Sequence, residues 1–196
     1  DAITTSDGFK QWFGDWEDPN AFSSKSTKGP VSVVVGGDGA PLRVFHSTRG
    51  DFNQFESRRK TYDNFGILGN VETFRNAVFF SDSVAQAEDY STEGDSGKFY
   101  PKSRTVPAYL NIKSPIDFTN SGLDYEGLAE ELGVSYGYLR NRTNVWELFD
   151  GADGEFLVEA AKKAGYDGAI FNEDRINRSA DDVGRTFAVF DSGQIK

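Results

Sequence analysis

The stretch Pro41-Leu-Arg-Val-Phe-His-Ser-Thr-Arg-Gly50 carries the only histidine among 196 residues. Apolar and polar residues alternate up to His46, which predicts a strand over residues 42–46 with one face in a core. Two hydroxyl residues, Ser47 and Thr48, follow at the end of this strand. A lone histidine at a strand end is more often structural than catalytic. The choice between these two roles therefore depends on other residues of the sequence.

Composition limits the partners. The chain is 37% hydrophobic and contains 17 phenylalanines, enough to build a core. Its formal net charge of −10 disfavours nucleic acid as a partner, because phosphate backbones attract basic surfaces. The basic cluster Ser57-Arg-Arg-Lys60 is best explained as a solvated loop. No apolar run approaches the length that spans a membrane, so we expect no membrane partner.

Composition also limits the chemistry. The chain has no cysteine, which excludes thiol nucleophiles, disulfides and cysteine–zinc sites. A single histidine disfavours a histidine-rich metal site, and we expect no metal. The chain also contains no methionine, even at position 1. We therefore expect a domain of a longer protein. We also expect this domain to be monomeric.

Helix and strand patterns mix without a regular βαβ rhythm, which predicts an α+β fold. Aromatic residues at helical spacing predict a helix over residues 7–16, N-capped by Asp7 and docked on a single domain of residues 1–196. The glycines of residues 36–39 predict a hairpin turn between strands 31–35 and 42–46, and they lack the Lys-Ser/Thr pair of a phosphate loop. Residues 49–75 are predicted to be irregular and to form a lid. Further strands are predicted at 77–81, 106–112, 167–171 and 186–190, and helices at 82–90, 125–132, 135–148 and 154–164.

Five short segments stand out when they are taken in chain order: residues 9–15 (FKQWFGD), 39–48 (GAPLRVFHST), 79–81 (FFS) with Tyr90 downstream, 165–171 (GYDGAIF) and 188–196 (AVFDSGQIK). In this order they resemble ADP-ribosyltransferases of the diphtheria-toxin and poly(ADP-ribose)-polymerase type. As a set they are most similar to the ADP-ribosyltransferase domains of phage polyvalent proteins and related bacterial toxins. The resemblance implies a split, antiparallel-rich β-sheet core with flanking helices.

The resemblance also implies that nicotinamide adenine dinucleotide (NAD) is the substrate. In the family, the histidine donates a hydrogen bond to a ribose hydroxyl, a role that falls here to His46. Tyr90 would stack on the nicotinamide, and the backbone of Ser47, where the family usually has glycine, would hold the nicotinamide amide. The implied catalytic residues are His46, Tyr90 and Thr186, and the implied NAD-binding residues are His46, Ser47, Thr48, Phe79, Phe80, Ser81 and Tyr90.

Thr186 departs from the family pattern. Active members usually carry glutamate there, at the start of the final strand, where it offsets the positive charge that grows on the ribose. Losing one such preorganised group typically costs about 10²–10³ in rate. Either the domain is slow, or it binds without reacting, or a carboxylate of residues 172–185 substitutes; the candidates are Glu173, Asp174, Asp181 and Asp182.

The function expected from this resemblance is a mono-ADP-ribosyltransferase that modifies a macromolecule, protein rather than nucleic acid. Chain elongation is disfavoured because it is associated with the missing glutamate. An NAD glycohydrolase and a catalytically degenerate NAD-binding module stay open as alternatives. The resemblance further implies a toxin or effector, part of a phage polyvalent protein, that acts in the host or target-cell cytoplasm after delivery.

Overall fold

The chain forms one mixed sheet flanked by helices, which confirms the α+β class. A computed structural model describes residues 2–23, 29–48, 54–56, 59–64, 70–92, 103–141, 144–173 and 184–196. The six-stranded sheet has the order β5-β1-β4-β8-β7-β6, and only the β6–β7 pair within it is parallel. Its strands are β1 (Val44–Thr48), β4 (Val78–Ser81), β5 (Arg104–Ala108), β6 (Pro115–Asp117), β7 (Gly168–Asn172) and β8 (Arg185–Val189).

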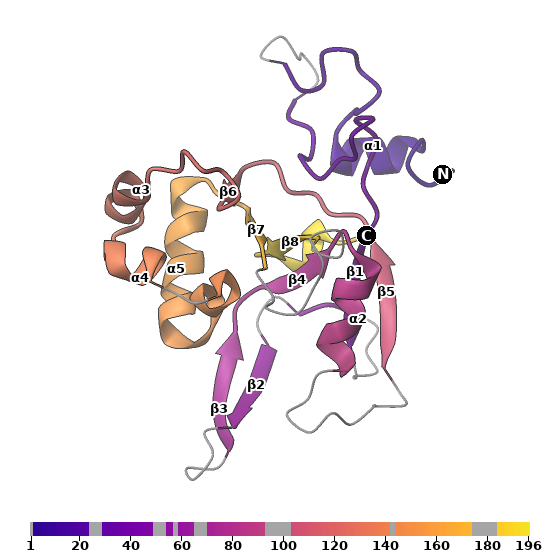
Figure 1. Cartoon of the computed structure of the whole chain (residues 1–196). Helices are drawn as coiled ribbons and strands as arrows, with labels where there is room; N and C mark the ends of the chain where they lie inside the picture. Colours follow the sequence, from indigo (N-terminus) through magenta and orange to yellow (C-terminus); the bar gives the residue numbers. More distant parts are fainter. Residues whose placement is uncertain are drawn as a thin grey trace.

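A separate hairpin and several helices complete the fold. The hairpin consists of β2 (Arg59–Asn64) and β3 (Asn70–Arg75) and extends away from the body of the molecule (Figure 1). In the same view α3, α4 and α5 gather on one side, and α2 lies beside β1 and β5. The helices are α1 (Asp7–Phe13), α2 (Val84–Thr92), α3 (Tyr125–Leu132), α4 (Tyr136–Arg140), η2 (Val145–Phe149), α5 (Gly151–Ala164) and η4 (Ser192–Gln194).

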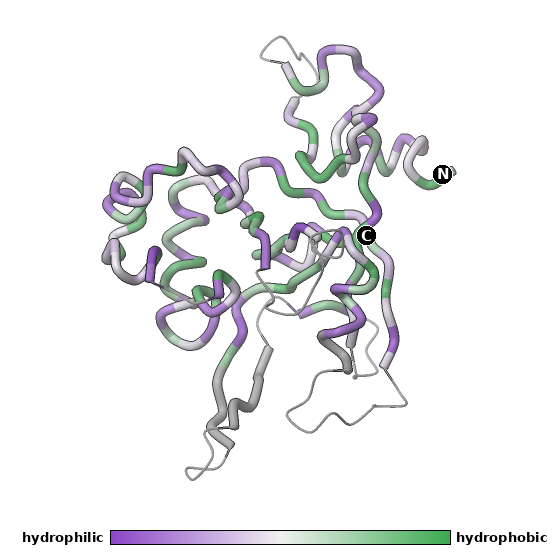
Figure 2. Tube along the Cα trace, viewed as in Figure 1, coloured by the Kyte–Doolittle hydropathy of each residue, from purple (hydrophilic) through white to green (hydrophobic). Residues whose placement is uncertain are grey.

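The sheet separates two hydrophobic cores, because side chains alternate between its faces along each strand. On β8, Ala188 faces the core that α3, α4, η2 and α5 cover, whereas Phe187 and Val189 face the other core. The second core is closed by apolar residues of the segment before β1, among them Val34. Figure 2 shows the hydrophobic residues gathered along these central strands.

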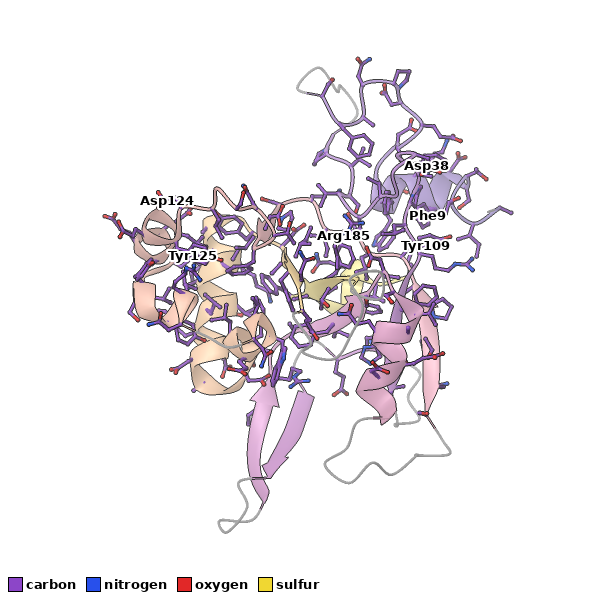
Figure 3. All side chains as sticks on the ribbon, viewed as in Figure 1. Phe9, Asp38, Tyr109, Asp124, Tyr125 and Arg185 are labelled. Carbon is purple, nitrogen blue, oxygen red and sulfur yellow. The ribbon has the colours of Figure 1, made fainter. Side chains whose placement is uncertain are left out.

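Helix α1 packs against the C-terminal segment. It is shorter than predicted because Gly14, with φ 107°, ends it after Phe13. Its N-cap is Ser6 rather than Asp7. The indole Nε1 of Trp12 donates a hydrogen bond to Gly193 O at 2.9 Å. The Phe9 ring meets the Tyr109 ring edge-on at 5.3 Å between centroids, and the two lie side by side in Figure 3.

Two predictions about the segments around β1 were wrong. Residues 31–35 are not a strand: their backbone hydrogen bonds go to scattered partners, such as Val33 N to Ile112 O, and Val35 forms only an isolated bridge with Pro41. Residues 59–64 and 70–75 of the segment expected to be irregular form the β2–β3 hairpin instead. Residues 49–53, 57–58 and 65–69 lie outside the described residues, and the lid role stays a prediction. The glycine turn at residues 36–39 is confirmed by the 2.9 Å hydrogen bond from Gly36 N to Ala40 O.

Two boundaries also differ. The strand predicted at 106–112 is β5 and ends at Ala108, since Tyr109 N then bonds to the C-terminal Lys196 O. The helix predicted at 135–148 is divided into α4 and η2, and residues 142–143 between them lie outside the described residues.

Of the neighbouring strands in the six-stranded sheet, β1 and β4 share the fewest paired residues. Within the described strands, β1 pairs with β4 only through Phe45 and Ser81, whereas it pairs with β5 along its whole length. Beyond Phe45 the two strands are no longer joined by ladder pairing. The candidate site lies at this opening.

Candidate functional site

A cavity of about 280 Å³ lies at the β1–β4 junction. This volume is at the lower end of the range of small-molecule sites, so the cavity suits one end of a dinucleotide rather than the whole. It brings together several residues that the sequence analysis selected, namely His46, Ser47, Phe79, Phe80 and Ser81. The remaining walls include residues that it did not select, among them Phe45, Gln54, Phe55, Glu56, Arg75 and Ala87.

The His46 ring has a defined orientation. Its Nδ1 lies 2.8 Å from Phe79 O on β4. A carbonyl oxygen can only accept, so Nδ1 carries the hydrogen, and the neutral ring has its lone pair on Nε2. The rings of Phe55 and Phe80 lie 5.3 and 5.4 Å from the imidazole, and the Phe55 contact is edge-on. The side chain thus bridges β1 and β4 where their ladder pairing stops.

Phe55 is a residue that the sequence analysis missed. Its ring lies 5.3 Å from that of Phe80 as well, so Phe55, Phe80 and His46 form a closed aromatic cluster in the cavity wall. The available signal was an aromatic residue shortly after His46, but nothing in the sequence showed that the chain folds back onto the histidine.

The hydroxyl residues near the cavity are engaged in local hydrogen bonds. Ser47 Oγ and Thr105 Oγ1 lie 2.7 Å apart across the β1–β5 pair. Ser81 Oγ accepts from Ser83 N at 3.0 Å, at the start of α2. Thr48 is 6% exposed and does not line the cavity.

Thr186 is buried behind the cavity rather than lining it. Its side chain has 0% exposure, and its Oγ1 accepts a 2.8 Å hydrogen bond from Gln86 Nε2. Gln86, which is 2% exposed, also accepts from Gly184 N at 2.8 Å through its Oε1. Hydrogen bonds between uncharged groups therefore hold the start of β8 against α2.

An ion pair strengthens the same connection. Asp82 accepts from Arg185 N at 2.7 Å and from Arg185 Nε at 2.9 Å. Gly184 lies so close that an added Cβ would come within 2.5 Å of Asp82 Oδ1. Arg185 is labelled near the centre of Figure 3. These contacts fix the register between the end of β4 and the start of β8.

Arg75 is the basic residue of the cavity wall, and the sequence analysis did not select it. Its Nε and Nη2 donate to the two carboxylate oxygens of Asp150 at 3.0 and 3.2 Å. The guanidinium carbon lies 5.5 Å from the centre of the Phe79 ring and 5.1 Å from that of Trp146. The cation is thus held between two aromatic faces and already neutralised by Asp150.

The other selected residues lie outside the cavity or outside the described residues. Tyr90 belongs to α2, but the position of its side chain is not among the described features. Glu173, directly after β7, is 6% exposed and does not line the cavity. Asp174, Asp181 and Asp182 lie outside the described residues. Within the described part of the chain, no three His, Asp or Glu side chains are grouped as they would be around a metal ion.

A family model described as ADP-ribosyltransferase in polyvalent proteins matches residues 36–196. The match includes the cavity residues and begins after the 9–15 segment and α1. Neither the curated proteins nor the solved structures yield a match to this chain. In the described ranges, no helix combines the length and the hydropathy needed to cross a bilayer.

Proposed function

The chain belongs to the ADP-ribosyltransferases of polyvalent proteins, and we propose that it cleaves NAD at the β1–β4 cavity and transfers a single ADP-ribose to a macromolecule. The family's substrate is NAD. The observation that carries the proposal is the convergence of His46, Phe79 and Phe80 from two strands onto one cavity. We further propose that residues 1–196 act as one domain, with α1 docked on it, and that Tyr90 is part of the binding site.

The cavity suits the nicotinamide end of NAD. Its lining includes four phenylalanines and the His46 ring, and a flat heteroaromatic ring gains both buried area and ring contacts there. In the tautomer assigned to His46, Nε2 of the neutral ring is a hydrogen-bond acceptor, and Nε2 of the protonated ring is a donor. A hydroxyl group serves both cases, so His46 positions the ribose in either state.

The reaction breaks the bond between ribose C1′ and the pyridinium nitrogen. The bonding electron pair goes to that nitrogen, which makes nicotinamide neutral, and C1′ becomes part of an oxocarbenium cation. A nucleophilic atom of the acceptor then attacks C1′ and loses its proton to solvent or a base. The charge of −10 supports a protein acceptor over a nucleic acid.

The resemblance to toxin domains supports an effector role in the cytoplasm of a host or target cell. A second candidate function is NAD binding without cleavage. It is favoured by Thr186, which is buried, neutral and bonded to Gln86 where active relatives carry glutamate. Water as the acceptor would make the protein an NAD glycohydrolase.

One assay separates these functions. The chain is incubated with NAD labelled in its adenylate phosphate and with cell lysate. Label on protein, with stoichiometric nicotinamide, supports the proposal. Free ADP-ribose alone indicates a glycohydrolase, whereas NAD that binds and is recovered intact indicates a binding module. His46→Ala is expected to weaken NAD binding and so to lower activity.

A further inference from the structure

We propose that Glu56 is a catalytic carboxylate that faces the positive charge developing on the ribose during NAD cleavage. The inference rests on the proposed function and adds to it a residue that the family pattern does not supply. Glu56 is the one acidic residue among the described residues that line the cavity.

Position 186 cannot carry the negative charge that faces the ribose. Thr186 is uncharged, and its oxygen already accepts from Gln86 Nε2. Its 0% exposure keeps it away from the cavity surface. Because the departing nicotinamide leaves a cation at C1′, an anionic group close to the cavity is still required for fast cleavage.

Glu56 lies next to the aromatic cluster of the cavity wall. It directly follows Phe55, whose ring is held against His46 and Phe80 at 5.3 Å from each. The backbone of Glu56 is therefore anchored one residue away from Phe55, whose ring contacts the histidine that would hold the ribose. Glu56 is solvent-exposed and lines the cavity.

Arg75 and Glu173 are the charged residues whose roles compete with that of Glu56. Arg75 lines the same cavity, but both oxygens of Asp150 accept from its guanidinium, so Asp150 rather than Glu56 balances this cation. Glu173 is buried after β7 and does not line the cavity.

The solvent exposure of Glu56 determines how strongly its charge acts on the reacting ribose. Water screens an exposed carboxylate, and the bound dinucleotide removes that water from the cavity, so the charge acts mainly in the loaded site. The carboxylate is then expected to favour the transition state over bound NAD. Its removal should lower kcat and leave the affinity for NAD nearly unchanged.

The test compares the rate of nicotinamide release by Glu56→Gln with that by the wild-type chain. NAD affinity is determined in a separate experiment, from the rise in melting temperature that NAD causes. We expect kcat to fall by about 10²–10³ and KM to change by less than about threefold. Glu56→Asp should recover part of the rate, because it restores the charge. Glu88→Gln is the matched control: it removes an exposed carboxylate from α2, outside the cavity lining, and should leave the rate unchanged.

The outcomes separate this inference from the function on which it rests. If the wild type releases nicotinamide and Glu56→Gln releases it equally fast, the role of Glu56 is refuted and the transferase function stands. A rate that falls in Glu56→Gln and Glu88→Gln alike shows a general charge effect and also refutes it. A wild type that binds NAD and releases no nicotinamide with any acceptor overturns both.

Discussion

Replacing Gln86 with leucine should destabilise the fold by an amount that the structure defines. Gln86 is 2% exposed and joins Gly184 N to Thr186 Oγ1 by hydrogen bonds of 2.8 Å each. Leucine has a similar volume but makes neither bond, so it leaves a backbone donor and a buried hydroxyl without these partners. Each loss costs about 1–3 kcal/mol, and the lower half of that range applies to Gly184, which is partly exposed.

We therefore expect Gln86→Leu to lower the free energy of unfolding by about 2–5 kcal/mol. For a chain of this size, that corresponds to a fall in melting temperature of about 4–20 °C. Urea unfolding followed by circular dichroism measures the free energy, and a calorimetric scan measures the temperature. A change below about 0.5 kcal/mol, the usual range of surface substitutions, would refute the proposed link between α2 and β8.

Two companion variants test the same link. Gln86→Leu combined with Thr186→Val should cost less than the sum of the single changes, because the second change removes the hydroxyl that the first left without its donor. Gln86→Glu should be destabilised at neutral pH and recover on acidification. Burial raises the folded-state pKa of an introduced carboxyl above its unfolded value, so the folded state binds more protons and stability falls as pH rises through that interval.

Three further substitutions test other parts of the account. Arg75→Lys should destabilise the fold by about 1–2 kcal/mol in urea, because an ammonium group cannot donate to both oxygens of Asp150 in the fork geometry, and an unchanged midpoint would argue against that pairing. Tyr90→Ala should abolish the rise in melting temperature that NAD causes while leaving the apo protein folded; a variant that unfolds outright would instead indicate a packing role. Gly184→Ala should be strongly destabilised, because its Cβ would lie 2.5 Å from Asp82 Oδ1, and a melting temperature equal to the wild type would contradict this close approach.

The residues that could be predicted from the sequence lie on short, strongly patterned segments. His46 at the end of β1 and the aromatic pair on β4 follow from alternation, and an N-cap at Asp82 or Ser83 follows from the capping residues before α2; both are local properties. Ser83 is the residue whose Oγ accepts from Gln86 N, at 3.2 Å. The order of the elements was also accessible in this way, with most boundaries shifted by a few residues.

The contacts that define the cavity depend on tertiary folding and have no local signal. Gln86 and Thr186 are 100 residues apart in the sequence, and Arg75 and Asp150 are 75 apart. A buried glutamine inside a polar helix pattern resembles any exposed one until its partners are known. The 31–35 segment shows the opposite error: a valine-rich run predicted a strand, but its backbone groups bond to several separate segments rather than to one neighbouring strand.

The central claim is that NAD binds and is cleaved beside His46, and the single histidine makes it directly measurable. Labelling with ¹⁵N-histidine yields signals from this side chain alone. When the His46 ring of the apo protein is neutral, we predict a hydrogen on Nδ1 and a lone pair on Nε2, as the 2.8 Å contact with Phe79 O requires. On titration with NAD, the Nε2 signal should shift saturably, and free nicotinamide should appear in the same sample. An Nε2 signal that does not move at NAD concentrations that saturate binding or support nicotinamide release would contradict the account, because it would place the site away from His46.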